Sequence, residues 1–235
     1  MKNFRASVVL PTYNEKENLG VAMREVTKVL GDNLEFVVVD DDSPDGTAQE
    51  AALLSKSFEV KLIVRKNRRG IGSALQEGYD NASSGIIVSI DTDLQQETGK
   101  LKEMLEMVEG GTEFVQGSRY LHGGSLEGFS FFRKVTSAVA NRLVLLLRSS
   151  KTPCTEATSN FRAFQKRVLR KVRIESRGFA GVPEFSLKAI KQGFSYKEVP
   201  IRFYNRKAGR SKLNVLKEMA GYLAALFSLR LQGKI

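Results

Sequence analysis

Short apolar runs alternate with segments of helical spacing along the first half of the chain. The apolar runs are residues 6–10, 34–39, 60–64, 85–90 and 113–116, and the segments with helical spacing are 15–30, 47–55, 72–81 and 100–109. This alternation predicts parallel strand–helix–strand units, and therefore an α/β fold with a Rossmann-like, mostly parallel sheet flanked by helices. Right-handed crossovers place the carboxyl ends of such strands at one edge of the sheet, where ligands bind.

The second half of the chain has a less regular pattern. Helical spacing predicts helices over 131–148, 182–192 and 213–229, residues 196–203 predict a further strand, and residues 161–172 are mixed and basic. We therefore expect one continuous domain over 1–212 and a carboxyl-terminal amphipathic helix within 213–235, which is a candidate for a membrane interface. The longest uncharged apolar run, 219–229, is shorter than the ~20 residues that cross a bilayer.

Charge divides the chain into an acidic first half and a basic second half. Residues 1–115 carry 13 Lys and Arg against 20 Asp and Glu, whereas residues 116–235 carry 24 against 6. Acidic clusters suit a metal ion and basic surfaces suit phosphates, although a scattered excess of charge also serves solubility. The single cysteine, Cys154, excludes an internal disulfide and a cysteine-based metal site. With no signal peptide visible at the amino end, we expect a reducing, cytosolic setting.

Polar clusters follow three of the predicted strands, so we expect them to meet at one edge of the sheet. Asp91 and Asp93 come directly after the strand over 85–90, and Gln95 follows them. Two carboxylates and an amide oxygen suit a hard divalent cation such as Mg²⁺, which completes its shell with water and substrate phosphates. A solvated turn or a helix cap has the same spacing, so this motif is weak when it stands alone.

The other two clusters suit a nucleotide. Asp40 and Asp41 end the second strand, where ribose hydroxyls or a base N–H would supply the donors that crowded carboxylates need, while Asp45 belongs to an ordinary turn. Tyr13 and Glu15, after the first strand, suit stacking on a base and accepting a hydrogen bond from it. A plain helix cap is the alternative interpretation of that segment.

Seven segments together resemble the family 2 glycosyltransferases, and within them the dolichol-phosphate mannose synthases and related polyprenyl-phosphate glycosyltransferases. They are LPTYNE at 10–15, VVDDDSPDGT at 38–47, RGIGSALQEG at 69–78, DTDLQ at 91–95, GSRY with GG at 117–124, TSNFRAF at 158–164, and EVPIRF with R..GRSKL at 198–213. The resemblance covers nearly the whole chain. It implies a GT-A fold, with 1–212 as the catalytic domain, a bound Mg²⁺ or Mn²⁺, a nucleotide-sugar donor and a dolichyl or other polyprenyl phosphate as acceptor.

The resemblance also implies roles for individual residues. It places nucleotide-sugar contacts at Pro11, Tyr13, Glu15, Asp40, Asp41, Asp91 and Thr92. It places metal contacts at Asp91, Asp93 and Gln95. It assigns catalytic and phosphate-handling roles to Asp93, Arg119, Arg133, Ser137, Arg206 and Lys212. The chain departs from the family pattern at Asp42, Thr92, Glu156 and Asn160, where the family usually has Gly, Ala, Asp and Gly, and this leaves the donor open.

A phosphate acceptor explains the lack of an obvious general base. A phosphomonoester has a second pKa of about 6, so it is largely ionised near pH 7 and needs cationic positioning rather than deprotonation. The only histidine, His122, lies in a Gly-flanked loop. We therefore predict inverting transfer of a hexose, most directly mannose from GDP-mannose, onto a polyprenyl phosphate.

Other functions remain open at this point. UDP-glucose or a UDP-N-acetylhexosamine are alternative donors, with a lipid or saccharide acceptor, and a non-catalytic binding module is a further alternative that the pair Asp91 and Asp93 disfavours. Nucleic acid is not an expected partner, because the aromatic residues are not interleaved with basic ones. Phe131 and Phe132, beside Arg133 and Lys134, suit a membrane surface. We expect a peripheral protein at the cytoplasmic face, with a possible membrane-anchoring partner, although these apolar residues also suit core packing.

Overall fold

The computed structural model describes residues 3–67, 70–205 and 215–235. Its strands are β1 (Ala6–Thr12), β2 (Leu34–Asp40), β3 (Glu59–Val64), β4 (Ile86–Ser89), β5 (Phe114–Ser118), β6 (Ser125–Glu127), β7 (Arg162–Gln165), β8 (Tyr196–Pro200) and β9 (Arg202–Tyr204). Its helices are α1 (Lys16–Leu30), α2 (Thr47–Leu54), α3 (Ile71–Asn81), α4 (Lys100–Glu109), α5 (Phe131–Leu146), α6 (Gly181–Lys191) and α7 (Val215–Leu231), with a 3₁₀ turn at Lys166–Arg170.

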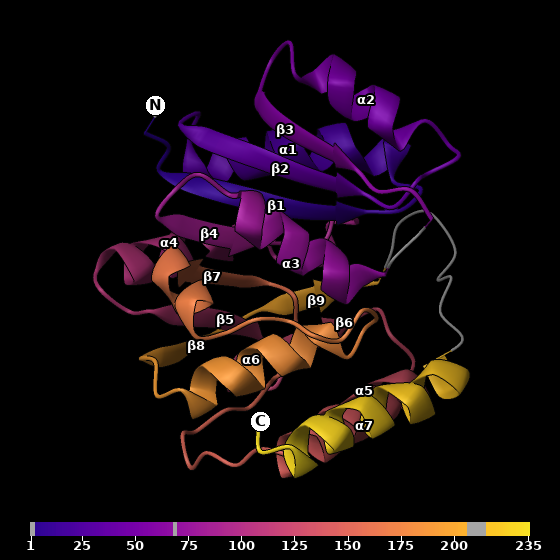
Figure 1. The fold of residues 1–235 in the computed structure, drawn as a ribbon, viewed down its shortest axis with the longest axis vertical. Coiled ribbons are helices and arrows are strands. Elements are labelled where there is room, and N and C mark those ends of the chain that lie inside the picture. Colours follow the sequence, from indigo (N-terminus) through magenta and orange to yellow (C-terminus); the bar gives the residue numbers. More distant parts are fainter. Residues whose placement is uncertain (1–2, 68–69, 206–214) are drawn as a thin grey trace.

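A seven-stranded sheet of order β3-β2-β1-β4-β7-β5-β8 runs through the molecule, with helices on both faces (Figure 1). The strands β3, β2, β1 and β4 pair in parallel, as do β5 and β8. β7 alone is antiparallel, and it lies between β4 and β5. The prediction of a mostly parallel sheet is therefore confirmed. β4 and β5 also run in the same direction, so both end at the same edge of the sheet.

Each face of the sheet has its own apolar cluster. Residues of α1, α2 and α4 pack on one face, where Leu19 and Met104 are fully buried. Residues of α3 and α6 pack on the other face, where Tyr79 and Phe185 join the rings of β5 and β7. Every residue of β2 is buried, as expected for a parallel strand that is covered on both sides. This two-sided core fixes the strand ends that carry the polar clusters.

The second half differs from its sequence pattern in two places. The mixed segment 161–172 forms the short strand β7 and then the 3₁₀ turn, which carries most of its basic residues. The strand expected over 196–203 divides at Ile201, because the chain leaves the main sheet after Pro200 and β9 pairs with β6 in a separate two-stranded sheet. Neither short strand has enough residues to show a period in the sequence.

Helices α5 and α7 lie side by side at one end of the molecule (Figure 1). Val144 of α5 and Leu226 and Leu229 of α7 share a small apolar cluster. The expected boundary near residue 212 falls outside the described residues, so the division into two parts stays a prediction. None of the helices in the described ranges has the length and apolar character that crossing a bilayer requires.

Candidate active site

The loops after the first four strands carry unusual backbone geometry. Four residues other than glycine have positive φ angles in the described chain: Asn14 (56°), Asp42 (57°), Asn67 (65°) and Leu94 (51°). Each of them lies in the loop that follows β1, β2, β3 or β4, at the carboxyl edge of the sheet. Asn and Asp tolerate this left-handed conformation, whereas a leucine rarely adopts it. Strained backbone of this kind is concentrated at binding and catalytic sites.

Asp91 follows β4 and is held by two side-chain amides. Asn160 Nδ2 donates to Asp91 Oδ1 at 3.0 Å, and Gln96 Nε2 donates to Asp91 Oδ2 at 2.7 Å. Burial, and then the negative charge of Asp93, raise the pKa of Asp91, against the opposing effects of the two amides and of Arg162. Two carboxylates are thus close enough to repel each other, which is the condition that a bound cation relieves.

The oxygen atoms at and beside Asp91 are suitable ligands for a divalent cation that completes its shell with phosphate oxygens. No Lys or Arg of the described chain forms an ion pair with Asp91, and Gln96 Oε1 is buried there without a hydrogen-bond partner. No cluster of three or more His, Cys, Asp or Glu occurs in the same part of the chain. Mg²⁺ is commonly held by one or two protein carboxylates together with substrate phosphates, and Asp91 with Asp93 supplies that number.

The carboxylates that end β2 already have donors within the chain. Asp40 is fully buried and accepts hydrogen bonds from the Thr12 hydroxyl (3.0 Å), the Ser43 hydroxyl (2.5 Å) and the Ser43 N–H (3.0 Å). Asp41 forms a buried ion pair with Arg65, whose Nε donates to Oδ1 at 2.6 Å. Thr12, Ser43 and Arg65 thus supply the hydrogen-bond donors that we had expected a nucleotide to supply. The nucleotide contacts at both aspartates stay predictions.

The segment after β1 lies beside the end of β2, since Thr12 and Asp40 are partners in the parallel pair. Pro11 and Tyr13 are partly exposed there. Glu15 is also partly exposed, and its carboxylate accepts a hydrogen bond from Asn18 Nδ2 at 2.7 Å. The structure therefore brings the three residues of this motif to the same edge as the aspartates.

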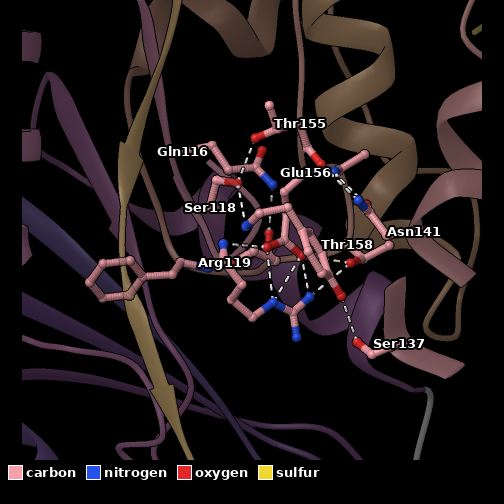
Figure 2. A network of polar contacts seen from close by, with 12 residues as sticks. Gln116, Ser118, Arg119, Ser137, Asn141, Thr155, Glu156 and Thr158 are labelled. Atoms are coloured by element: carbon pink, nitrogen blue, oxygen red, sulfur yellow. Dashed lines mark hydrogen bonds and ion pairs between the residues drawn. The ribbon is translucent and has the colours of Figure 1, made fainter. Parts of the chain in front are cut away.

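Arg119 follows β5 and is fixed by a buried carboxylate (Figure 2). Glu156, which is fully buried, accepts from the backbone N–H of Arg119 at 2.9 Å and from its guanidinium, and Thr158 Oγ1 accepts a further guanidinium bond at 2.9 Å. Burial lowers the pKa of Arg119, but the charge and hydrogen bonds of Glu156 outweigh it and leave the pKa raised. Ser137, from α5, makes a 2.8 Å hydrogen bond with Tyr120, the neighbour of Arg119.

Two phenylalanine rings connect Arg119 with Arg133. The Arg119 guanidinium lies 5.1 Å from the centre of the Phe203 ring, and the Arg133 guanidinium lies 5.0 Å from the centre of the Phe129 ring. The two rings stack on each other with centroids 5.8 Å apart. Cations over aromatic faces are attracted by the ring quadrupole, so this column holds the two arginines in one group.

Phe203 also connects the arginines with the carboxylate pair. It forms an isolated backbone bridge with Gln96, the residue whose amide holds Asp91. The segment after β4 that carries the candidate metal ligands is therefore joined to β9, whose Phe203 ring contacts Arg119, by backbone pairing.

A family model for glycosyl transferase family 2 matches residues 7–190. The chain belongs to this family. The chain is also 36% identical over 230 residues to a dolichol-phosphate mannosyltransferase of Pyrococcus furiosus, covering 96% of this chain and 63% of the relative. It is 33% identical over 219 residues to a polyprenol monophosphomannose synthase of Mycolicibacterium smegmatis, covering 89% of this chain and 81% of the relative. The chain thus spans less than two thirds of the Pyrococcus protein.

Two solved structures have a similar fold. A glucosyl-3-phosphoglycerate synthase from Mycobacterium tuberculosis, in complex with Mn²⁺ and UDP, matches with a TM-score of 0.72 at 20% identity, covering 96% of this chain and 79% of that chain. A mannosyl-3-phosphoglycerate synthase from Rubrobacter xylanophilus matches with a TM-score of 0.67 at 19% identity, covering 98% and 75%. At these identities the likeness shows the fold alone, and it confirms the predicted GT-A fold.

The remaining predicted residues of this family 2 chain are placed less directly. Thr92, which separates Asp91 from Asp93 in the sequence, is buried. Gln95 Nε2 donates to the Tyr204 carbonyl at 2.8 Å, so its side chain reaches β9, and its contact with a metal stays a prediction. Arg206 and Lys212 lie outside the described residues.

Sequence reasoning missed the residues that hold the predicted ones. Gln96 and Asn160 contact Asp91, and Glu156 holds Arg119. Asn160 and Glu156 stand at two of the four positions where the chain departs from the family pattern. Those departures were the signal in the sequence that could have pointed to them. At Asp42 the backbone φ is 57°, a conformation that glycine adopts at no steric cost and that aspartate tolerates. The local backbone therefore accommodates both the family's glycine and the aspartate of this chain.

Proposed function

We propose that this protein transfers mannose from GDP-mannose to a dolichyl or other polyprenyl phosphate, with inversion at the anomeric carbon, in the presence of Mg²⁺ or Mn²⁺. The names of the two relatives, at 36% and 33% identity, support the sugar and the lipid acceptor. The observation that carries the proposal is the contact between the two halves of the site. Gln96, whose side chain donates a hydrogen bond to Asp91, pairs through its backbone with Phe203, and the Phe203 ring lies against the Arg119 guanidinium.

In this proposal Asp91 and Asp93 hold the divalent cation and Arg119 binds the acceptor phosphate. The cation, when bound, neutralises the charge of the departing nucleoside diphosphate. Because Glu156 and the Phe203 ring fix the Arg119 guanidinium, little side-chain freedom remains to be lost when a phosphate binds. The acceptor is already ionised, so the chain needs no general base.

The test is transfer of radiolabelled mannose from GDP-mannose to a polyprenyl phosphate with Mn²⁺. We expect label in the lipid phase for the wild type, and a loss of at least 100-fold for Asp93→Asn, on the order of the effect of losing one charge-stabilising group. Asp80→Asn is the matched control, because this aspartate lies on α3 and pairs with Arg173 away from the sheet edge. We expect the control to retain transfer.

Three results would contradict parts of this proposal. Transfer from UDP-glucose or a UDP-N-acetylhexosamine, with none from GDP-mannose, would replace the donor. A retained anomeric configuration, read from the ¹H coupling of the product, would overturn the inverting displacement. No transfer from any of these donors would overturn the activity.

The proposal includes a membrane surface at the cytoplasmic face, since the acceptor is a lipid. Along α5, an exposed apolar stripe of helical spacing consists of Phe131, Phe132, Val135, Val139, Leu143 and Leu146. Phe131 and Phe132 are 82% and 77% exposed, and the exposed Arg142 lies on the same side of the helix. Apolar side chains with interspersed cations suit the boundary between lipid headgroups and acyl chains. A membrane-anchoring partner would act in addition to this surface.

Co-sedimentation with phosphatidylcholine–phosphatidylglycerol vesicles tests the surface. Full burial of one phenylalanine contributes about 1.5–3 kcal/mol, so we expect Phe131→Ser to weaken vesicle binding ~10-fold or more. The control is Leu53→Ser, because Leu53 is 57% exposed on α2, at the other end of the molecule (Figure 1). Equal binding by the wild type and both variants would exclude α5 as the membrane contact.

A further inference from the structure

Asn160 is buried at the edge of the candidate metal site and uses both atoms of its amide. Its side chain is 4% exposed. Its Nδ2 donates to Asp91 Oδ1 at 3.0 Å, and its Oδ1 accepts from the Ser89 hydroxyl at 2.8 Å. Turning the amide over would place its oxygen against the carboxylate oxygen of Asp91. Only one orientation of the amide therefore satisfies both neighbours.

The direction of β7 brings Asn160 to this place. β7 runs antiparallel to β4, with Ser89 opposite Arg162, so the residues just before β7 lie beside the end of β4. A parallel strand would have placed the start of β7 at the opposite edge of the sheet. Ser89 is the last residue of β4 and is fully buried, so the residue to which Asn160 is tied is itself fixed in the core.

Two amides hold Asp91, one at each oxygen. Gln96 Nε2 donates to Oδ2 at 2.7 Å while Asn160 donates to Oδ1. A carboxylate oxygen accepts at two lone-pair positions, so one position on each oxygen remains after these bonds. Because both donors are neutral, they fix the plane of the carboxylate without neutralising its charge. This differs from Asp41 and Glu156, whose partners are arginines.

We infer that Asn160 is a positioning residue that holds the Asp91 carboxylate in the orientation in which it takes a divalent cation. The inference rests on the proposed function, which places a cation at Asp91 and Asp93. Hydrogen-bond partners behind a metal ligand typically change metal affinity by about 10–100-fold when they are removed. A glycine at this position, as in the family pattern, has no amide side chain, so this contact is a property of the present chain.

The experiment is a Mn²⁺ titration of the full chain in the presence of GDP, with unbound Mn²⁺ measured by electron paramagnetic resonance. Asn160→Gly removes the amide, and Asn160→Leu removes it while keeping its volume. The matched control is Asn141→Leu, because Asn141 is also 4% exposed and also uses both amide atoms, on the Thr155 carbonyl and the Ala157 N–H. We expect the Kd for Mn²⁺ to rise about 10–100-fold in both Asn160 variants and less than about twofold in the control.

The outcomes separate the inference from the function on which it rests. If the wild type binds Mn²⁺ and Asn160→Gly binds it within twofold as tightly, the positioning role is overturned. An equal loss in Asn141→Leu would assign the effect to general destabilisation and would also overturn it. If the wild type with GDP binds no Mn²⁺, the metal site of the proposed function fails together with the inference. Should Asn160→Leu not fold, Asn160→Gly decides.

Discussion

Replacing Asp41 by alanine is expected to cost the protein a large part of its stability. Arg65 is 2% exposed, and its main acceptor is the Asp41 carboxylate, which also accepts from the Gly70 N–H at 2.9 Å. Without it, the guanidinium retains the Ser73 hydroxyl and the Gly70 carbonyl as hydrogen-bond acceptors. Removing one partner of a buried ion pair typically costs about 3–5 kcal/mol.

The second carboxylate near Arg65 places the expected loss at the lower end of that range. Glu77 lies 3.7 Å from Nη1 but is 35% exposed, so its charge is partly screened. We expect a loss of about 3 kcal/mol in the free energy of unfolding. For a chain of this size each kcal/mol corresponds to about 2–4 °C, so Tm should fall by about 6–12 °C.

Urea unfolding followed by circular dichroism measures this loss. Asp32→Ala, at an exposed aspartate, is the control and should change the free energy of unfolding by less than about 0.5 kcal/mol. The double variant Asp41→Leu with Arg65→Met should recover most of the stability, because apolar replacement of both partners removes the unpaired charge. If Asp41→Ala stays within about 1 kcal/mol of the wild type, the ion pair does not have the assigned role. Repeating the measurement with GDP shows whether Asp41 also contacts the nucleotide, since the stabilisation by GDP would then shrink.

Three further predictions concern other parts of the fold. Gly72→Ala places a methyl group against the carbonyl oxygen of Ser176, so we expect the free energy of unfolding to fall by about 1–3 kcal/mol. Thermal unfolding measures this loss, and an unchanged Tm would refute the contact. Burial raises the pKa of Cys154 to about 11, so at pH 8 we expect its thiol to react with Ellman's reagent at least ~10-fold more slowly in the folded than in the urea-unfolded protein; equal rates would contradict this. Hydrogen bonds from Lys188 and Lys234 lower the pKa of Glu175 below its usual 4.5, so its stabilisation is present above that pH and is lost as the pH falls through the lower folded value. Glu175→Gln should therefore be less stable than the wild type at pH 7 and approach it in acid, and a constant difference would count against the ion pairs.

The parallel part of the sheet could be predicted from the sequence because its strands are continuous apolar runs. β1 and β2 are buried on both faces, so each is a continuous apolar run that can be recognised without an alternation of apolar and polar residues. The polar residues at their ends mark the carboxyl edge of the sheet. β7 could not be predicted in this way. It has four residues, begins with Arg162, and lies in a basic segment, yet Arg162 is fully buried against Phe185. Its position depends on two strands that are distant in the sequence.

The positions of the polar residues were readable from the sequence, but their partners were not. Asp41 pairs with an arginine 24 residues further along, and Arg119 pairs with a glutamate 37 residues further along. Such pairs depend on how the strands are arranged, and local spacing carries no information about them. A motif can therefore show that a carboxylate stands at a strand end without showing whether the fold itself already uses it.

The nature of these partners distinguishes Asp91 from Asp41 and Glu156. Asp41 and Glu156 are each neutralised by an arginine, so the fold already balances their charge. Asp91 instead accepts hydrogen bonds from two neutral amides, and its pKa is raised by burial and then by the charge of Asp93, against the opposing effects of the amides and of Arg162. Amides orient a carboxylate but leave its charge in place, and two adjacent negative charges are costly until a cation binds. Of these three acids, Asp91 is therefore the one that forms no ion pair within the described chain, and the one that a cation from outside would stabilise most.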